Sequence, residues 1–281
     1  MVETIADLDR LHAAAVRECT GMGDSEVVWH CWGSGPLVIL LHGGGGSWRH
    51  WVRTIPALAA DHALLVPDMP GFGESRLPEG AGGFAAMVDG LLHGIEELVP
   101  SGQAFALVGF SLGGRVAALL AEALGDRVRQ LVIVGTSPVE PNPAPAPYQI
   151  PLRGLEGEAL EEAHRANLGT FMFADPAHVD PLAVAISLHG VSRRSIRRSA
   201  LIGLPIMTNA LPATRAPVAM LFGEGDWVAH EGFDAIRTAL ARLRPDADLT
   251  ILPGAGHWAM YEQATSFNQW LRARLTDSGR T

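Results

Sequence analysis

The sequence predicts an α/β protein with a mostly parallel central sheet, helices on both faces of the sheet and an inserted helical cap. Short apolar runs, typical of buried parallel strands, alternate along the chain with stretches whose apolar residues recur at helical spacing. This alternation fails between about residues 139 and 212, where the cap is expected. With 48% hydrophobic and 18% charged residues among 281, the composition is that of a well-packed globular protein.

The first predicted elements are a helix and then a strand. A helix is expected from Thr4 to Glu18, and a strand follows over residues 26–32, which alternate loosely between apolar and polar. Pro56 interrupts the helical pattern after Trp51, because proline lacks the amide that a helix interior requires. Further short apolar strands are expected at residues 36–42, 62–68, 104–110, 131–137, 217–223 and 248–254.

Two long helices of the core are predicted from apolar periodicity. Helical spacing is found for Phe84, Val88, Leu91, Ile95 and Leu98 in one stretch, and for Val116, Leu119, Leu120, Ala123 and Leu124 in the next. The second stretch begins where the strand at residues 104–110 ends. A strand therefore runs directly into a helix at this point.

The segment 139–212 is predicted to be a helical cap inserted into a core domain made of residues 1–138 and 213–281. It opens with "PVEPNPAPAPYQIP", whose six prolines exclude a core helix or strand and indicate a semi-rigid connector. Two or three helical stretches follow, including "LEGEALEEAHRANL" and "DPLAVAISLHGVSRRSIRRSALIG". The strand at residues 217–223 then resumes the alternating pattern.

Charge and composition exclude several classes of function. A net charge of -9 argues against a nucleic-acid partner, because a phosphate backbone calls for a basic face. The two cysteines, Cys19 and Cys31, are too few for a disulfide framework and lack the spacing of a metal site. The start "MVETIADLDRLHAAAV" mixes charges throughout, unlike a signal peptide, and no apolar run approaches the ~20 residues of a membrane span. We therefore expect a cytoplasmic protein without a membrane partner, whose oligomeric state the sequence leaves open.

The stretch "GFSLG", residues 109–113, places Ser111 between the predicted strand and the predicted helix. A G-x-S-x-G motif in this context is typical of a nucleophile elbow, in which a tight turn strains the serine backbone and exposes its hydroxyl. The start of the following helix favours developing negative charge. A structural interpretation stays open beside it, because Ser111 could cap the helix while the glycines relieve crowding.

A serine hydroxyl becomes a good nucleophile only when a base removes its proton, so a histidine and an orienting acid are required. His257 follows the strand "DLTIL" and a glycine-rich turn that can aim its ring across the top of the sheet; alternatively, it stacks on Trp258 in a loop. Asp226, directly after the strand "VAMLF", is the predicted acid, although a turn aspartate is common there. Glu224, earlier in the same turn, is the competing acid.

The stretch "HGGGGSW", residues 42–48, follows a strand and predicts an oxyanion loop. Its glycines let backbone amides approach a substrate oxygen, and each such donor contributes about 3 kcal/mol in the transition state. Gly44 and Leu112 are the predicted donors, whereas a glycine run can also be simply a flexible loop. His42 is expected to order the loop and not to act as a second base.

Taken in chain order, these motifs resemble the α/β-hydrolase superfamily. "HGGGG", "DMPGFGES", "GFSLGG", "GEGD" and "GAGHW" are similar to its oxyanion loop, the turn after its next strand, its nucleophile elbow, its acid and its histidine. The resemblance implies the α/β-hydrolase fold, Ser111 as nucleophile, and no metal or organic cofactor. A serine at the elbow is unlike the epoxide hydrolases and haloalkane dehalogenases of this fold, which carry aspartate there.

The closing stretch "GHWAMYEQATSFNQWL" is similar to that of carbon–carbon bond hydrolases of aromatic meta-cleavage pathways. Those enzymes usually have a proline in the oxyanion loop and an asparagine before the serine, whereas this chain has "GGGGSW" and Phe110. The resemblance therefore favours a serine hydrolase acting on a small, largely hydrophobic carboxylic ester or related acyl substrate. The alternatives are a carbon–carbon bond hydrolase of a meta-cleavage-type dienoate and a slow-turnover small-molecule receptor of the same fold.

The remaining predicted site residues are those expected to contact the substrate. They are Gly43, Phe110 and Trp258 beside the predicted catalytic residues, and Arg193, Arg194 and Arg197 in the cap motif "SRRSIRR". On a helix Arg193 and Arg197, or Arg194 and Arg198, share a face. Two interpretations stay open: a solvated surface paired with the acidic stretch "EGEALEEA", or one inward arginine on a substrate carboxylate, as the resemblance to the carbon–carbon hydrolases implies.

Overall fold

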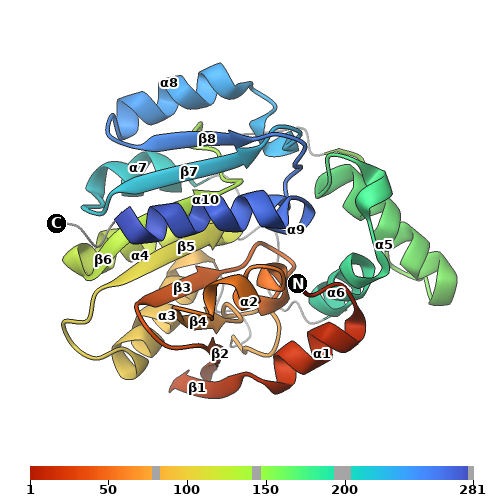
Figure 1. Cartoon of the computed structure of the whole chain (residues 1–281), viewed down its shortest axis with the longest axis horizontal. Helices are drawn as coiled ribbons and strands as arrows, with labels where there is room; N and C mark the ends of the chain where they lie inside the picture. Colours follow the sequence, from red (N-terminus) through yellow and green to blue (C-terminus); the bar gives the residue numbers. More distant parts are fainter. Residues whose placement is uncertain (78–82, 141–146, 193–203, 278–281) are drawn as a thin grey trace.

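The structure, a computed structural model, describes residues 1–77, 83–140, 147–192 and 204–277. Its centre is an eight-stranded sheet with the order β1-β2-β4-β3-β5-β6-β7-β8 (Figure 1). The strands are β1 (Val16–Met22), β2 (Ser25–Trp32), β3 (Leu37–Leu41), β4 (Ala63–Pro67), β5 (Phe105–Phe110), β6 (Val128–Val134), β7 (Val218–Gly223) and β8 (Asp248–Leu252). The pairs β1–β2 and β2–β4 are antiparallel, and the other pairs are parallel. The predicted α/β-hydrolase fold with a mostly parallel sheet is confirmed.

Helices cover both faces of this sheet. The α-helices are α1 (Ile5–Ala13), α2 (Ile55–Leu58), α3 (Phe84–Leu98), α4 (Leu112–Leu124), α5 (Gly157–Phe171), α6 (Pro181–Ser192), α7 (Ile206–Ala213), α8 (Phe233–Leu243), α9 (Ala259–Glu262) and α10 (Ala264–Asp277). The 3-10 helices among the described residues are η1 (Trp48–Trp51), η2 (Gly125–Arg127), η3 (Pro176–His178) and η5 (Trp227–Ala229). Among the described residues, no helix is long and apolar enough to cross a bilayer.

The sheet divides the hydrophobic core into two layers. Val38 and Leu40 of β3 belong to the apolar cluster that includes α2 and α10, whereas Ile39 and Leu41 belong to the cluster of α3, α4, α7 and α8. Alternate residues of a strand point to opposite faces, so a strand covered on both sides must be apolar throughout. This double burial explains why the parallel strands could be predicted as continuous apolar runs.

The amino-terminal helix is shorter than predicted, because β1 occupies part of the expected range 4–18. Thr4 and Asp7 form a capping box at the start of α1, and the helix ends at Ala13. The strand β1 then pairs with β2 at the edge of the sheet, with Cys19 opposite Val28. From Val16 to Gly21 only Thr20 is buried, so this strand lacks the apolar pattern that identified the others.

The predicted helical insertion is present, and its described part comprises α5, η3 and α6. Figure 1 shows α5 and α6 beyond the end of the sheet to which the arrows of β7 and β8 point. Helix α7, which the sequence analysis places in the insertion, instead packs against α4 and α8 of the core. Its apolar residues Met207, Ala210 and Leu211 are fully buried there. The residue limits of the two predicted domains otherwise stay predictions.

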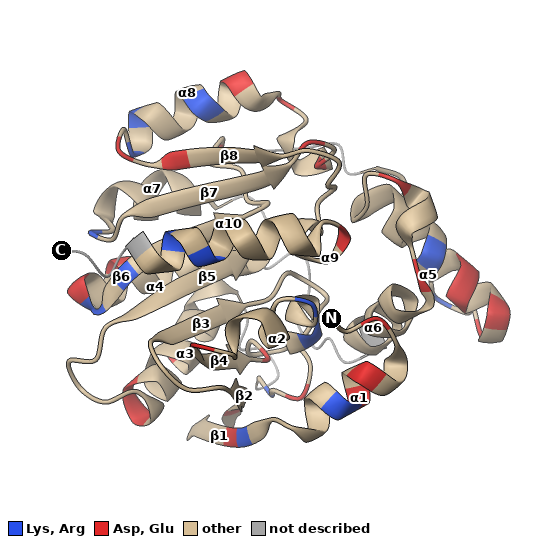
Figure 2. Ribbon diagram, in the orientation of Figure 1, with Lys and Arg blue, Asp and Glu red and all other residues tan. Residues whose placement is uncertain are grey.

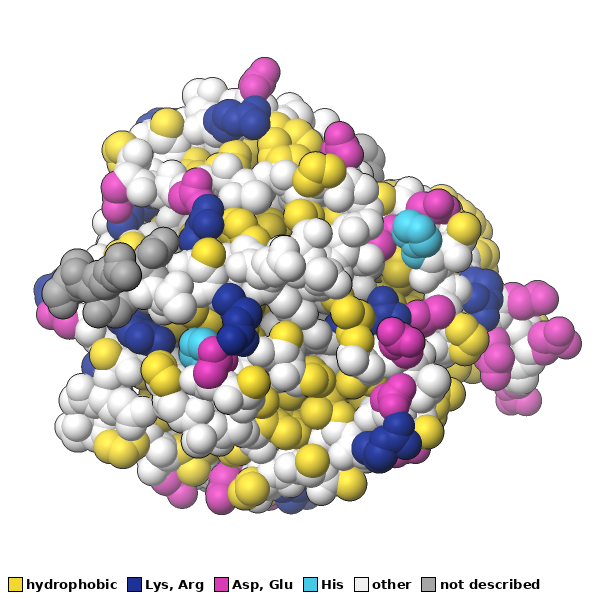
Figure 3. All heavy atoms as spheres, viewed as in Figure 1, with side chains coloured by type: hydrophobic (Ala, Val, Ile, Leu, Met, Phe, Trp, Pro, Cys, Tyr) yellow, Lys and Arg dark blue, Asp and Glu magenta, His cyan; other side chains and the backbone are white. Residues whose placement is uncertain are grey.

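The outer part of α5 is acidic. Glu158, Glu161 and Glu162 are exposed. Figure 2 shows acidic positions along the ribbon of α5, and Figure 3 shows acidic side chains gathered at this edge of the molecule. Acidic residues near a helix amino terminus interact favourably with the helix dipole. The arginines Arg193, Arg194 and Arg197, which the sequence analysis considered as partners of this stretch, lie outside the described residues.

Candidate active site

Ser111 lies at a sharp turn between β5 and α4. Its φ of 53° and ψ of -115° make it the one non-glycine residue with positive φ in the described part of the chain. The Ser111 amide donates to the Val134 carbonyl at 2.8 Å, and the Thr136 hydroxyl donates to the Ser111 carbonyl at 2.8 Å. A backbone in this sparsely populated region persists only where its surroundings hold it, and such strain concentrates at functional sites.

The glycines beside Ser111 are required by close backbone packing. A Cβ atom on Gly109 would lie 2.3 Å from the Gly113 carbonyl oxygen. A Cβ atom on Gly113 would lie 2.5 Å from the carbonyl oxygens of Leu41 and His42. Because these are backbone atoms of buried residues in β3, in the loop that follows it and in α4, they cannot move aside, and only glycine lets the start of α4 approach β3 and β5.

Ser111, His257 and Asp226 form a hydrogen-bonded line. The His257 Nε2 atom lies 3.0 Å from Ser111 Oγ, and His257 Nδ1 lies 2.9 Å from Asp226 Oδ1. Since an ionised carboxylate only accepts hydrogen bonds, Nδ1 carries the hydrogen and Nε2 is free to accept from the serine hydroxyl. His257 and Asp226 are each 5% exposed. The line joins segments that follow β5, β7 and β8, so the parallel sheet brings together residues far apart in sequence.

The two candidate acids occupy different positions. Asp226 Oδ1 also accepts from the Val228 amide at 2.9 Å, so this carboxylate caps η5 and faces His257 at the same time. Glu224 is exposed, and its Oε2 accepts from the Gly254 amide at 3.2 Å. The structure therefore brings Asp226, and not Glu224, to the histidine.

Gly44 and Leu112, the predicted oxyanion donors, are neighbours beside Ser111. A Cβ atom on Gly44 would lie 3.6 Å from Leu112 Cδ2. Leu112 is the first residue of α4, where the backbone amide has no acceptor within its own helix. Gly44 is exposed, and Leu112 is half-buried. Their assignment as donors stays a prediction, now with the two residues placed side by side.

His42 is buried and holds the predicted oxyanion loop, residues 42–48, in place. Its Nδ1 donates to the Gly43 carbonyl at 2.8 Å, and its Nε2 accepts from the Met69 amide at 2.9 Å. Burial lowers the pKa of His42 to about 4, so the ring is neutral near pH 7. Both nitrogens are occupied by backbone groups, which is the arrangement of a loop-ordering residue and not of a second base.

Two further residues support this loop, and the sequence analysis gave them no role. Asp68 accepts from the amides of Trp48 and Glu74, each at 2.8 Å, and burial raises its pKa to about 6. His50 Nδ1 accepts from the Gly43 amide at 3.2 Å. Asp68 opens the motif "DMPGFGES", so the signal for it was present, whereas no motif marks His50.

Phe110 and Trp258, predicted to contact substrate, pack behind the candidate site. Each is 1% exposed. The Phe110 ring lies 4.9 Å from the His257 ring, and the Trp258 indole donates to the His50 carbonyl at 2.9 Å. Gly43 is buried as well. These contacts position the histidine and the loop, and direct contact of these three residues with substrate stays a prediction.

The inserted region reaches the candidate site at two places. Phe171, at the end of α5, makes an edge contact with Trp227, whose ring centroid lies 5.9 Å from that of His257. A Cβ atom on Gly190 of α6 would lie 2.3 Å from the Gly45 carbonyl oxygen, so α6 packs directly on the oxyanion loop. Trp227 of the core therefore lies next to the histidine, and Phe171 of the cap packs against Trp227. The sequence analysis did not identify Trp227.

Comparison with known proteins places the chain among hydrolases. The model of a family described as the alpha/beta hydrolase family matches residues 38–270. A 2-hydroxy-6-oxo-6-phenylhexa-2,4-dienoate hydrolase of Burkholderia cepacia is 29% identical over 262 residues, which cover 84% of this chain and 86% of that protein. A pimeloyl-[acyl-carrier protein] methyl ester esterase of Vibrio atlanticus is 30% identical over 259 residues, which cover 85% and 94%.

The fold is shared with solved hydrolase structures. A carboxylesterase from Bacillus subtilis superposes with a TM-score of 0.80 at 20% identity, over 96% of this chain and 94% of that one. At this identity the likeness shows the fold alone. The relatives thus include both an ester hydrolase and a carbon–carbon bond hydrolase.

Proposed function

The chain belongs to the alpha/beta hydrolase family, and we propose that it is a serine hydrolase of small, largely hydrophobic carboxylic esters or related acyl compounds. The observation that carries the proposal is the hydrogen-bonded line from Ser111 Oγ through His257 to Asp226, with distances of 3.0 and 2.9 Å. This line starts at the strained serine of a strand–helix turn. The same arrangement serves acyl transfer on several unrelated folds.

The proposed reaction proceeds in two stages. His257 Nε2 takes the hydroxyl proton of Ser111 as Oγ attacks the substrate carbonyl carbon, and Asp226 stabilises the imidazolium that forms. The amides of Gly44 and Leu112 donate to the oxyanion, and the alcohol leaves with the proton from His257. A water molecule, deprotonated by His257, then attacks the acyl-serine ester and releases the carboxylic acid.

The proposed preference for apolar substrates is supported by the aromatic side chains next to the histidine. Phe171 and Trp227 meet edge to face with their ring centroids 5.6 Å apart, and both are partly exposed. Apolar walls with a few polar groups are typical of small-molecule sites. The ester hydrolase among the relatives supports the same choice of reaction.

The proposal is tested by comparing kcat/KM for neutral p-nitrophenyl esters of increasing acyl length with kcat/KM for a meta-cleavage-type dienoate. We expect the esters to be turned over and the preferred acyl group to be apolar. Turnover of the dienoate with kcat/KM above that of every ester would replace ester hydrolysis by carbon–carbon bond cleavage. Stoichiometric binding without turnover of either class would support the receptor hypothesis instead.

Carbon–carbon bond cleavage is the second candidate function, because several relatives are dienoate hydrolases. It leads to a prediction about the cap motif "SRRSIRR", residues 192–198. If one arginine binds a substrate carboxylate, its alanine variant raises KM for an acidic substrate by about 10- to 100-fold, because a bidentate charged hydrogen bond is lost. KM for a neutral ester stays unchanged.

Single alanine variants of Arg193, Arg194, Arg197 and Arg198, assayed on matched acidic and neutral substrates, provide the measurement. Arg153, an exposed arginine of the same inserted region, gives the control variant. If no variant raises KM for the acidic substrate more than KM for the neutral one, none of these arginines binds the carboxylate. The ester hydrolase proposal then gains support.

A further inference from the structure

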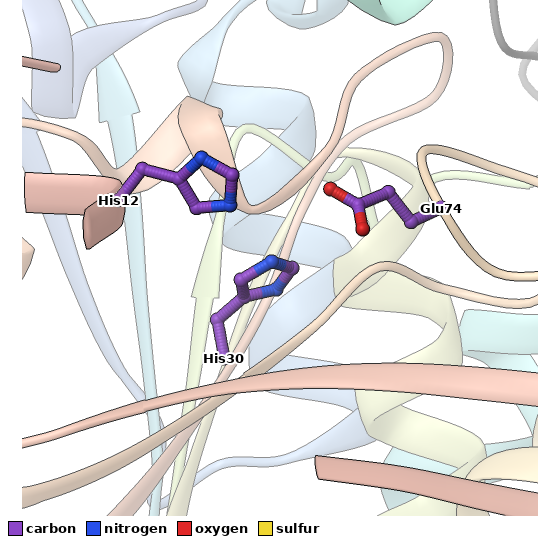
Figure 4. A group of neighbouring side chains, drawn as sticks. All are labelled: His12, His30 and Glu74. Atoms are coloured by element: carbon purple, nitrogen blue, oxygen red, sulfur yellow. The ribbon is translucent and has the colours of Figure 1, made fainter. Parts of the chain in front are cut away.

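His12, His30 and Glu74 point toward one another from three separate elements (Figure 4). His12 belongs to α1, His30 to β2, and Glu74 to the turn that follows β4. One ligand atom from each residue lies within 4.8 Å of the ligand atoms of the other two. Two imidazoles and a carboxylate converging on one point form a donor set that divalent transition metals bind in proteins.

The central histidine of this group lacks other partners. His30 is fully buried, and neither of its ring nitrogens has a hydrogen-bond partner among the described residues. Its neighbours are aromatic: the ring centroids of Trp48 and Trp32 lie 5.3 and 6.1 Å away. A buried polar group without a partner costs about 1–3 kcal/mol, and binding of an ion is one of the few explanations for such a group.

We propose that His12, His30 and Glu74 bind a divalent transition metal ion of the zinc class, separate from the hydrolytic site. Histidine nitrogen and carboxylate oxygen are both usual zinc ligands, and three protein ligands leave a fourth position for water. An imidazole ring binds such an ion through the lone pair of a ring nitrogen that carries no hydrogen.

Metal binding requires the three ligand atoms to move closer together. Zinc–nitrogen distances of about 2.0–2.1 Å in a tetrahedral site correspond to ligand atoms about 3.3 Å apart. The Glu74 side chain can supply most of this movement, because it is half-buried and has rotatable bonds, whereas His30 is fixed between aromatic rings. An open cleft of about 590 Å³ reaches Glu74 from solvent and is lined by Arg17 among others, whereas neither histidine belongs to its lining.

Arg17 competes with a metal for this carboxylate. Its Nε lies 3.4 Å from Glu74 Oε2, and its side chain is 49% exposed. Removing the Arg17 charge should therefore increase metal affinity, while loss of any of the three ligands should reduce it. General attraction of cations to an acidic protein predicts the same signs for Arg17 and Glu74. Loss of affinity on replacement of His12, which removes a ligand atom but no negative charge, therefore distinguishes a built site from such attraction.

A bound ion would connect the first helix, through His12, to strand β2, through His30. Through Glu74 it would also connect both to the turn that supports the predicted oxyanion loop. Trp48 and Glu74 are both held by Asp68, so the ligand Glu74 lies one hydrogen bond from that loop support. The expected role is structural, because none of the three proposed ligands is one of the hydrogen-bonded residues Ser111, His257 and Asp226. Metal binding should raise Tm and leave the chemistry at Ser111 in place.

The test is titration of untagged, chelator-treated protein with Zn²⁺ by calorimetry, followed by the visible absorption of the Co²⁺ form. We expect one ion per chain. His12→Gln and Glu74→Gln should each weaken Zn²⁺ affinity by about 100-fold or more, because loss of a direct ligand exceeds the 10–100-fold loss of a supporting contact. Arg17→Gln should strengthen it. His12→Gln should also abolish the intense visible bands of four-coordinate Co²⁺.

His93→Gln is the matched control, because His93 forms an exposed pair with Glu97 at 3.7 Å on α3. Zn²⁺ affinity equal to wild type is expected for this variant. The proposal is overturned if wild-type protein binds no stoichiometric ion, if His12→Gln and His93→Gln weaken binding equally, or if neither His12→Gln nor Glu74→Gln weakens it. Circular dichroism and ester turnover of each variant confirm that it is folded.

Discussion

If Ser111 is the nucleophile, replacing it with alanine is expected to lower kcat for a short p-nitrophenyl ester by about 10⁶-fold, as loss of the nucleophile does in known triad enzymes. The variant keeps a Cβ and the same strained backbone, which the hydrogen bonds to Val134 and Thr136 hold in place. The fold should therefore survive. Steady-state assay of the purified variant, with its far-UV circular dichroism, measures both effects.

Ser101→Ala provides the control, since Ser101 is an exposed turn residue. Its kcat should equal that of the unmodified protein. If Ser111→Ala keeps more than a tenth of the original kcat, and contamination is excluded, Ser111 is not the nucleophile.

Replacing Asp226 with asparagine is expected to lower kcat by about 10⁴-fold. The amide has the shape of the carboxylate but can donate to His257 Nδ1, which favours the tautomer whose Nε2 carries the hydrogen and cannot accept the serine proton. Asp226 is also 5% exposed, so solvent does not replace its charge. Assays of kcat across pH for the variant and the unmodified protein measure the loss.

Glu224→Gln is the matched control from the same turn. Its carboxylate is exposed and faces the Gly254 amide, so the change should lower kcat by less than about 10-fold, as expected for a surface contact. The opposite ranking of the two variants would make Glu224 the acid and would contradict the geometry described for Asp226.

The sequence predicted the structure best where burial or close backbone packing allows only one type of residue. The parallel strands are buried on both faces and so appear as continuous apolar runs, and the turn at Ser111 admits only glycine at residues 109 and 113. The edge strand β1 could not be predicted in this way, because it is nearly all exposed and pairs on one side only. Helix α7 followed the irregular cap segment in sequence and was therefore assigned to it, although it packs on the core.

Local sequence patterns could not predict contacts between residues that are distant in sequence. Trp227 lies beside His257 only because β7 and β8 are neighbours in the sheet, and the turn after β7 carries no motif that marks its indole. His12, His30 and Glu74 are likewise separated by long intervals of unrelated spacing, and only the fold brings them together. Local spacing identifies motifs, whereas such sites depend on the topology of the whole sheet.

The central claim is that Ser111 is a nucleophile activated by His257. Its most direct test is the intact mass of the protein after treatment with a fluorophosphonate, followed by peptide mapping of the adduct. One phosphonyl group per chain, located on Ser111 and absent from the Ser111→Ala variant, is the predicted result. An unmodified protein, or an adduct on any other residue, would contradict the claim.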